Sequence, residues 1–408
     1  MNRKHLTRSM AVVIAVGALL TTAACSGNSS SSPSGSANGT PIEIGMIVDV
    51  TGPISFATTP TGAKAAVASI NAAGGVNGHP LDLFVCDSGG NSTTAADCGQ
   101  QMVSKQVAAV IRPSSIVADS FIPILEAAKI PMIAPQVSTP AGFSSPETFA
   151  LADSPPIYYP GFARMLADQG SSNIAMVSAE GAAFASIFQL PPLGVKNYSR
   201  PINFNNVTVP LTAADMAPYA QAVNNTNPDG VIAAVPDQQA ISLTQLLKSS
   251  NPAQKIVVFG TDAANVISNI TSTLGTVQGL YTLNYYNAGG SEPVAQEYRT
   301  QTAALGASAD QAVNDYAMQA AYAAVLVFAE VSGGMSSDIT GANVTTALNQ
   351  ANNVTINGFA PAINFTTPVP QAGGARVFTA CVQEATYSGT TKKALGGFIN
   401  AFTGAACS

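Results

Sequence analysis

The alternation of strand-like and helix-like segments constrains the fold of this chain more than any other feature. Short segments rich in isoleucine and valine recur along the sequence, and apolar residues at helical spacing lie between them. The strand-like segments are residues 42–50, 81–86, 108–111, 131–134, 173–178, 230–235 and 256–259. Parallel strands need long crossovers that are usually helical, so this alternation predicts an α/β fold with parallel sheets covered by helices.

The segments between the strands carry apolar stripes at helical spacing. Ala63, Ala66, Val67 and Ile70 recur at i, i+3, i+4 and i+7, which places them on one face of a helix. The pair at 74–75 is Gly-Gly, which predicts the end of this helix because glycine readily adopts the left-handed conformation found there. The same spacing appears within residues 216–223 and 317–328. We expect these stripes to form the core.

Three breaks in the alternation predict a two-lobed chain. About 370 residues follow the first 40, too many for one small core. The breaks are Asp153-Ser154-Pro155-Pro156, the end of residues 280–287 before Gly289-Gly290, and residues 359–365. Consecutive prolines continue neither a helix nor a strand. We therefore expect two Rossmann-like lobes, residues 41–153 plus 287–360 and residues 154–286 plus 361–408, joined by a three-strand hinge that lets them close over a cleft.

The first 24 residues have the layout of a secretory signal. Arg3, Lys4 and Arg8 make a basic start, an apolar run covers residues 10–20, and small residues lead to Cys25. A run of about eleven apolar residues is too short to span a membrane, which takes roughly 20. We therefore expect residues 1–24 to be an export signal and the mature protein to be extracytoplasmic.

Cys25 is a candidate lipidation site. Thr22-Ala23-Ala24-Cys25 resembles the bacterial lipobox, although Thr22 stands where leucine is usual. The alternative is ordinary signal cleavage near Ala24, with Cys25 incidental. Residues 26–40 are rich in Ser, Gly and Asn and hold too little apolar surface to offset the entropy of ordering them. Residues 25–40 are thus predicted to tether the domain to the outer face of the cytoplasmic membrane.

Four further cysteines suggest disulfides, because disulfides persist in exported proteins. They are Cys86, Cys98, Cys381 and Cys407. Of the three possible connectivities we favour Cys86 with Cys98 and Cys381 with Cys407, since each pair is local. Four free thiols are the alternative.

Composition and motifs argue against several functions. The formal net charge is −6, and it becomes −9 when the three basic residues of the signal are removed. An acidic domain of this kind does not favour nucleic acid or a basic membrane-binding face. Past the signal the chain has one histidine, His79, and it has neither a GxxxxGK[ST] nor an HExxH motif. We expect no catalytic activity, no cofactor and no metal.

A series of motifs follows in order along the chain. They are Ile44-Gly45, Thr51-Gly52-Pro53, Gly62, residues 70–78 and Pro80-Leu81, followed by residues 107–111 before Pro113-Ser114-Ser115 and residues 129–133 before Ser138-Thr139-Pro140. In this order and spacing the sequence resembles the type I periplasmic binding proteins, in particular the branched-chain amino-acid binding proteins. The resemblance covers roughly residues 41 to 400. It implies a monomer that binds a ligand between two lobes, where strands end and loops begin.

The resemblance places ligand-binding residues in the first lobe. Ser114 and Ser115 stand where the family's serine loop accepts a carboxylate, and Val137, Ser138 and Thr139 match its second carboxylate-contacting loop. Phe56 stands where the family has an aromatic residue against the ligand side chain. The alternatives are turn and cap serines and a core aromatic.

In the second lobe the resemblance points to two positions. Phe184 falls where the family has a ligand-contacting tyrosine. Asp262 matches the acidic residue that holds the ligand's ammonium, and a helix N-cap is its alternative role. Arg112 departs from the family's glycine before Pro113, so its side chain is expected either to face solvent or to lean into the cleft toward an acidic ligand group. Asp153 is interpreted as a turn residue.

The resemblance implies a solute-binding lipoprotein that captures a small polar ligand, an amino acid or a similar compound, and delivers it to the membrane subunits of an ABC importer. Alternatives are a ligand-sensing receptor subunit, or a binder of an amide, urea or small carboxylic acid. In the expected mechanism the ligand carboxylate docks on Ser114, Ser115 and Thr139, Asp262 takes the ammonium, and the lobes close.

Overall fold

The computed structural model describes residues 37–52, 54–136, 139–260 and 262–407. These residues belong to one compact unit of the chain, Ser34–Ser408. The predicted signal, Cys25 and most of the predicted tether lie outside the described residues, so these assignments stay predictions.

The first lobe is built on a parallel sheet. Its strands are β1 (Ile42–Val48), β2 (Leu81–Asp87), β3 (Val110–Ile111), β4 (Met132–Ile133) and β5 (Thr148–Phe149). They pair in the order β2-β1-β3-β4-β5, and every pair is parallel. β1 is buried along nearly its whole length, which explains why its sequence is a continuous apolar run.

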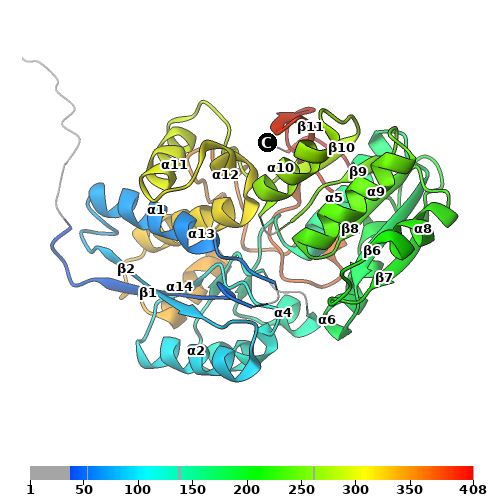
Figure 1. Ribbon diagram of the computed structural model, residues 1–408. Coiled ribbons are helices and arrows are strands. Elements are labelled where there is room, and N and C mark those ends of the chain that lie inside the picture. The colour runs from blue at the N-terminus through cyan, green and yellow to red at the C-terminus, as the bar shows by residue number, and fades with distance from the viewer. Residues whose placement is uncertain (1–36, 53, 137–138, 261, 408) are drawn as a thin grey trace, which may run out of the picture. The chain divides into compact units, whose positions relative to one another are not determined.

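Helices from two distant parts of the sequence cover this sheet. The first set is α1 (Thr59–Ala72), α2 (Ser92–Ser104), α3 (Ile122–Ala127) and α4 (Pro140–Ser144); the second is α11 (Pro293–Ala304), α12 (Ala309–Asn314), α13 (Tyr316–Gly333) and α14 (Gly341–Gln350). Figure 1 shows α1 and α13 on one side of the sheet and α2 on the other. At Gly62 a Cβ atom would lie 1.9 Å from the Met318 carbonyl oxygen, so α1 and α13 approach this closely only because the residue is glycine.

The second lobe is built on a mixed sheet. Its strands are β6 (Asn173–Ala179), β7 (Asn203–Val209), β8 (Gly230–Ala234), β9 (Lys255–Val257), β10 (Leu280–Asn284), β11 (Cys381–Ser388), β12 (Thr391–Ala394) and β13 (Ile399–Asn400). The order is β12-β11-β10-β9-β8-β6-β7, with β13 on β11. Pairs among β6 to β10 are parallel, whereas β11 is antiparallel to its neighbours.

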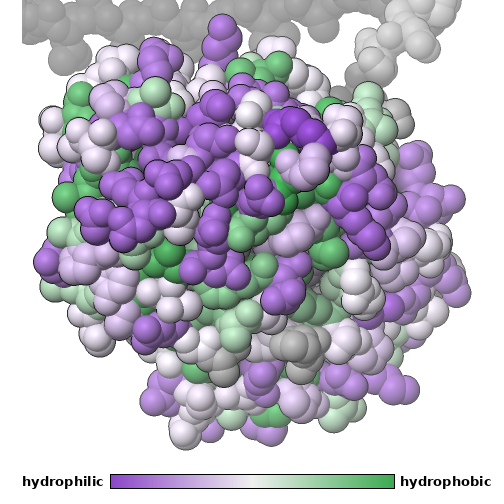
Figure 2. Space-filling model, turned by 90° about the vertical axis from the view of Figure 1, so that its right-hand side faces the viewer, coloured by the Kyte–Doolittle hydropathy of each residue, from purple (hydrophilic) through white to green (hydrophobic). Residues whose placement is uncertain are grey.

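The helices of the second lobe are α5 (Pro155–Asp168), α6 (Ala182–Ala185), α7 (Pro191–Gly194), α8 (Ala217–Asn225), α9 (Asp237–Ser250) and α10 (Ala263–Leu274). Pro155 and Pro156 begin α5. Proline is tolerated there because the first helical turn has no partner for its N–H groups. The face of the molecule in Figure 2 carries mainly hydrophilic residues, with apolar ones interspersed.

The predicted α/β fold with two lobes is confirmed. Each of the seven predicted strand segments overlaps a strand, and the stripe of residues 63–70 lies in α1. Gly74 and Gly75 follow Ala73, the C-cap residue of α1, and have φ angles of +104° and +73°, as the predicted helix end requires.

The chain passes between the two sheets three times: between β5 and α5, between β10 and α11, and between α14 and β11. The third passage lies later than the predicted boundary at 360/361. Phe365 and Phe378 both pack on Phe149 of β5, with ring centroids 6.0 and 5.6 Å away, and the Phe378 N–H donates to Ala150. These contacts hold residues 363–378 to the first lobe, so we propose a boundary near Thr379 and keep the other boundaries as predictions.

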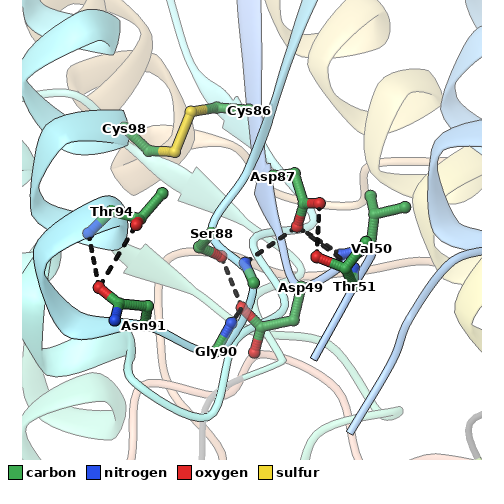
Figure 3. Close-up of a disulfide and its surroundings, with 11 residues drawn as sticks. Asp49, Val50, Thr51, Cys86, Asp87, Ser88, Gly90, Asn91, Thr94 and Cys98 are labelled. Carbon is green, nitrogen blue, oxygen red and sulfur yellow. Dashed lines mark hydrogen bonds between the residues drawn. A yellow bond between two sulfur atoms is a disulfide. The ribbon is translucent and has the colours of Figure 1, made fainter. Parts of the chain in front are cut away.

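The structure contains the two favoured disulfides. Cys86–Cys98 joins β2 to α2 (Figure 3), and Cys381–Cys407 joins β11 to the C-terminal segment. The alternative of four free thiols is therefore wrong. Among the described residues no helix is both long and apolar enough to cross a membrane.

Candidate ligand-binding site

A cavity of about 570 Å³ opens where strands of both sheets end. In the first lobe it is lined by residues 54–58 after β1, by Ser115 after β3 and by Gln136 after β4. In the second lobe the lining comes from residues 211–213 after β7 and 234–239 at the end of β8, joined by Phe259, Gly260 and Asp262 after β9. This is the carboxyl edge of the parallel strands, where open α/β sheets bind ligands.

Aromatic side chains form much of the cavity wall. The six are Phe56, Tyr158, Tyr159, Phe184, Phe259 and Tyr316. Phe259 connects the two sides of this group, with ring centroids 4.9 Å from Tyr158 and 5.1 Å from Tyr316. Burial raises the pKa of each of the two hydroxyls, Tyr158 and Tyr316, far above the ordinary value of a tyrosine, and both stay neutral at physiological pH.

The predicted residues of the first lobe are only partly brought together. Phe56, Ser115 and Thr139 line the cavity. Ser114 is fully buried, is not among the lining residues, and its hydroxyl donates to the Arg112 carbonyl at 3.2 Å. Val137 and Ser138 lie outside the described residues. The structure therefore places Ser114 behind the wall.

Carboxylates of the protein already accept hydrogen bonds from donors in or next to both loops that were expected to bind a ligand carboxylate. The Thr139 hydroxyl donates to Asp119 at 2.5 Å. The Ile116 N–H donates to Asp49 at 2.9 Å. Asp49 also accepts from the Ser88 hydroxyl at 2.6 Å and from the Gly90 N–H at 2.9 Å, as Figure 3 shows.

Two aspartates and a glutamine stand together on the second lobe. Asp262 lines the cavity and also accepts from the Asn265 N–H at 3.1 Å, so it is both the predicted wall residue and the helix cap given as its alternative. The Asp262 N–H donates to Asp237, the first residue of α9, at 2.9 Å. Phe184 lines the same wall.

Gln239, two residues after Asp237, has an unusual hydrogen-bond balance. Its Nε2 atom lies within 2.9 to 3.2 Å of the carbonyls of Pro210, Leu211 and Ala213. The amide orientation is thereby fixed, because three carbonyls need the NH₂ group. Its Oε1 atom is buried and has no hydrogen-bond partner within the described residues.

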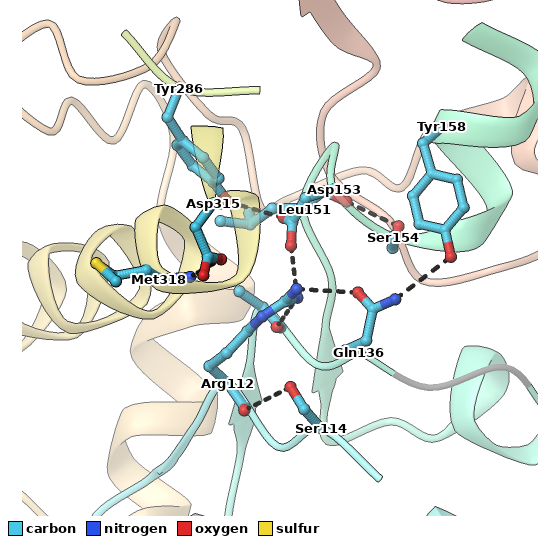
Figure 4. A network of polar contacts seen from close by, with 11 residues as sticks. Arg112, Ser114, Gln136, Leu151, Asp153, Ser154, Tyr158, Tyr286, Asp315 and Met318 are labelled. Atoms are coloured by element: carbon cyan, nitrogen blue, oxygen red, sulfur yellow. Dashed lines mark hydrogen bonds and ion pairs between the residues drawn. The ribbon is translucent and has the colours of Figure 1, made fainter. Parts of the chain in front are cut away.

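Arg112 faces neither solvent nor the cavity, which corrects both expectations for it. Its side chain is fully buried and its Nη1 atom pairs with Asp153 at 2.5 Å. The guanidinium also donates to the Ala134 carbonyl and to Gln136 Oε1, each at 2.9 Å (Figure 4). Gln136 lines the cavity and donates to the Tyr158 hydroxyl at 3.3 Å. Gln136 thus separates Arg112 from the cavity, and Arg112 fixes the orientation of the Gln136 side chain.

Asp153 lies in a turn, as interpreted from the sequence, but its side chain is buried. Its side chain is 1% exposed and accepts from the Tyr286 hydroxyl at 2.7 Å as well as pairing with Arg112. Asp153 lies in the first passage between the lobes and Tyr286 in the second, so the network of Arg112, Gln136, Asp153 and Tyr286 connects both passages to the cavity wall.

Sequence reasoning missed Gln136, Asp237, Gln239 and the tyrosines. Asp237 had a usable signal, because it follows the predicted strand 230–235 directly, where a side chain reaches the carboxyl edge of the sheet. The described residues contain no group of three His, Cys, Asp or Glu side chains arranged to hold a metal ion.

Comparison with known proteins gives one family and many similar folds. The family model described as "Periplasmic binding protein" matches residues 41–390. No curated protein matches the sequence.

Similar solved structures include an extracellular ligand-binding receptor from Verminephrobacter eiseniae (18% identity, TM-score 0.71, covering 86% of this chain and 99% of that one). Another is a fatty acid ABC transporter substrate-binding protein from Thermomonospora curvata (15% identity, TM-score 0.73, covering 88% of this chain and 92% of that one). A third is a branched-chain amino acid transporter substrate-binding protein from Streptococcus pneumoniae in complex with isoleucine (14% identity, TM-score 0.68, covering 87% of this chain and 99% of that one). At these identities the likeness concerns the fold.

Proposed function

Since the chain belongs to the periplasmic binding protein family, we propose that it captures a small polar ligand, an amino acid or a similar compound, and delivers it to an ABC importer. The observation that carries this proposal is the cavity at the carboxyl ends of both sheets, with lining residues from both lobes. Its volume of about 570 Å³ lies in the range of small-molecule sites.

The proposed ligand contacts are the predicted residues that line the cavity. They are Phe56, Ser115 and Thr139 on the first lobe and Phe184 and Asp262 on the second. Val137 and Ser138 remain proposed contacts of the loop after β4. Ser114 and Arg112 support this wall from behind.

Closure of the lobes is the proposed mechanism. A ligand touches both walls at once only when the lobes are closed, so it binds the closed state more tightly and shifts the population toward it. Three chain passages allow such a hinge. The closed complex then presents the ligand to the permease.

The protein acts outside the cytoplasm in this proposal, as a monomer held at the outer face of the membrane through lipidated Cys25. The sequence supports this with the signal-like residues 1–24 and the polar residues 26–40. The family's printed description, periplasmic, agrees with an extracytoplasmic location.

The test is a thermal-shift experiment on residues 26–408, unfolded and refolded with disulfides intact to remove carried-over ligand. A ligand at a hundredfold over its Kd adds about 2.7 kcal/mol. With an unfolding entropy of about 2.1 cal/mol/K per residue, the midpoint should rise by about 3 to 4 °C. The panel contains amino acids, their amides and small carboxylic acids. If no member of the panel shifts the midpoint, the proposed binding function is wrong.

A matched pair of variants locates the site. Asp262→Ala should weaken binding by about ten- to a hundredfold, because hydrogen bonds to charged groups contribute about 1.5 to 3 kcal/mol. Asp310→Ala is the control, since Asp310 is exposed on α12 and does not line the cavity. Equal affinities of the two variants would remove Asp262 from the site.

A further inference from the structure

We propose that the ligand of this cavity is a net cation, held by acceptors on the second lobe and carrying no ionised carboxylate against the first. This inference rests on the proposed function and specifies the ligand class of the same site. It follows from the distribution of charges and hydrogen-bond donors around the cavity.

The wall of the second lobe offers acceptors. Asp237 and Asp262 both line the cavity, and their loops are joined by the hydrogen bond from the Asp262 N–H to Asp237. Gln239 lines it too, is 6% exposed, and keeps an Oε1 atom without a donor. A buried acceptor without a donor is unfavourable, and its negative partial charge adds to the charges of the two aspartates on this wall.

No basic side chain of the described residues lines the cavity to balance these carboxylates. Arg112 lies one residue behind the wall but is paired with Asp153. Asp315 adds acidity behind the wall: burial, with a further contribution from the negative charge of Asp262, raises its pKa to about 6. Lys392 of β12 is close enough to interact electrostatically with Asp315, but it is not a lining residue.

The described part of the first-lobe wall disfavours a ligand carboxylate. The Thr139 hydroxyl, which was expected to donate a hydrogen bond to that carboxylate, donates it to Asp119. The Ile116 N–H, directly after the serine loop, donates a hydrogen bond to Asp49. The Val117 N–H donates to the Ser115 hydroxyl oxygen at 3.2 Å. A carboxylate docked here would meet protein carboxylates where it needs donors, and like charges repel.

Closure makes the charge balance decisive. When the lobes close, Asp237 and Asp262 lose water, and a buried carboxylate is costly unless a cation or hydrogen-bond donors replace that water. A zwitterion brings one positive and one negative charge, so it leaves the net charge of the cavity unchanged. A cation with several N–H donors compensates the charge of the two aspartates.

The experiment compares matched sets of compounds on refolded residues 26–408 by calorimetry. Leucine, phenylalanine and lysine are each tested as the amino acid, as its amide, and as the acid without its α-amino group. The amide keeps the ammonium and removes the carboxylate charge. In at least one set the amide should bind tenfold or more tightly than the amino acid, and the acid should not bind.

Two outcomes overturn the inference while leaving solute binding in place. One is an amino acid or acid that binds as tightly as its amide or more tightly. The other is binding to a different class of compound with no response to any amide. If neither the amides nor any other solute binds, both the inference and the proposed function fail.

Charge-neutralising variants test the two walls separately. Asp237→Asn should weaken amide binding tenfold or more. Asp119→Asn should reduce the ratio of amide affinity to amino-acid affinity, because it removes the negative charge beside the Thr139 hydroxyl. Asp310→Asn, an exposed aspartate away from the cavity, is the matched control and should change neither value. If Asp237→Asn and the control bind the amide with the same Kd, the carboxylates of the second-lobe wall do not recognise the ligand and the inference is wrong.

Discussion

Replacing Arg112 by methionine should destabilise the protein strongly. The change keeps a long side chain but leaves the Asp153 carboxylate, 1% exposed, with the Tyr286 hydroxyl and no cation. Removing one partner of a buried ion pair costs about 3 to 5 kcal/mol because the other charge stays buried without compensation. The loss of the hydrogen bonds to Ala134 and Gln136 acts in the same direction.

Urea unfolding followed by circular dichroism at fixed pH measures this effect, since the chain has no tryptophan to report by fluorescence. With a urea dependence of about 3 kcal/mol/M or more, the midpoint should fall by on the order of 1 M. Arg200→Met is the matched control, because Arg200 donates to the Ser171 and Ala167 carbonyls and its loss leaves no buried carboxylate. The control should lose about 1 to 2 kcal/mol.

A double variant separates the buried charge from lost packing. Asp153→Asn removes the charge but keeps an oxygen that accepts from Tyr286, so adding it to Arg112→Met should restore at least half of the lost stability. Two results would refute the reasoning: a cost below about 1 kcal/mol for Arg112→Met, or no recovery in the double variant.

Three further predictions concern other parts of the chain. Replacing Cys86 and Cys98 together by serine should cost roughly 3 kcal/mol, because the 12-residue separation closes a short loop in the unfolded chain; urea unfolding with and without reductant measures it. Burial raises the pKa of Asp315 from 3.8 to about 6, so the folded protein binds this proton more tightly than the unfolded chain does. The free energy of unfolding that the group contributes is therefore fully present below pH 4 and falls as the pH rises to about 6. Asp315→Asn should remove that decline, which urea titrations at pH 4.5 and 7 would detect. Cys25→Ser should release the protein from the membrane fraction of producing cells, and retention there would contradict lipidation.

Most of the strands that the sequence predicts are buried on both faces, with the edge strand β2 as the exception. In parallel sheets such strands are continuous apolar runs, and β1 and β8 show this plainly. The edge strand β7 was missed because its sequence, NFNNVTV, has mostly exposed and half-buried positions and contains three asparagines. The polar strands β11 and β12 were missed for the same reason.

The residues of the candidate site that belong to a motif of the family could be predicted from the sequence. Those whose role depends on contacts with distant parts of the chain could not. Ser115, Thr139 and Asp262 follow strands, and their positions came from the resemblance. Arg112 could not be placed from the sequence because its environment joins Asp153 with Tyr286, which lies 133 residues further along the chain. Contacts of that separation leave no local pattern.

The packing of α1 against α13 has a consequence for the order of folding. Helix α1 ends at Ala72, but the partner that Gly62 admits so closely, Met318 of α13, is synthesised almost 250 residues later. The first lobe therefore cannot complete its core until nearly the whole chain has been made, because such long-range contacts form only after the intervening chain is available. The first lobe therefore stays incompletely packed for longer during synthesis than a lobe made from one continuous stretch of chain would.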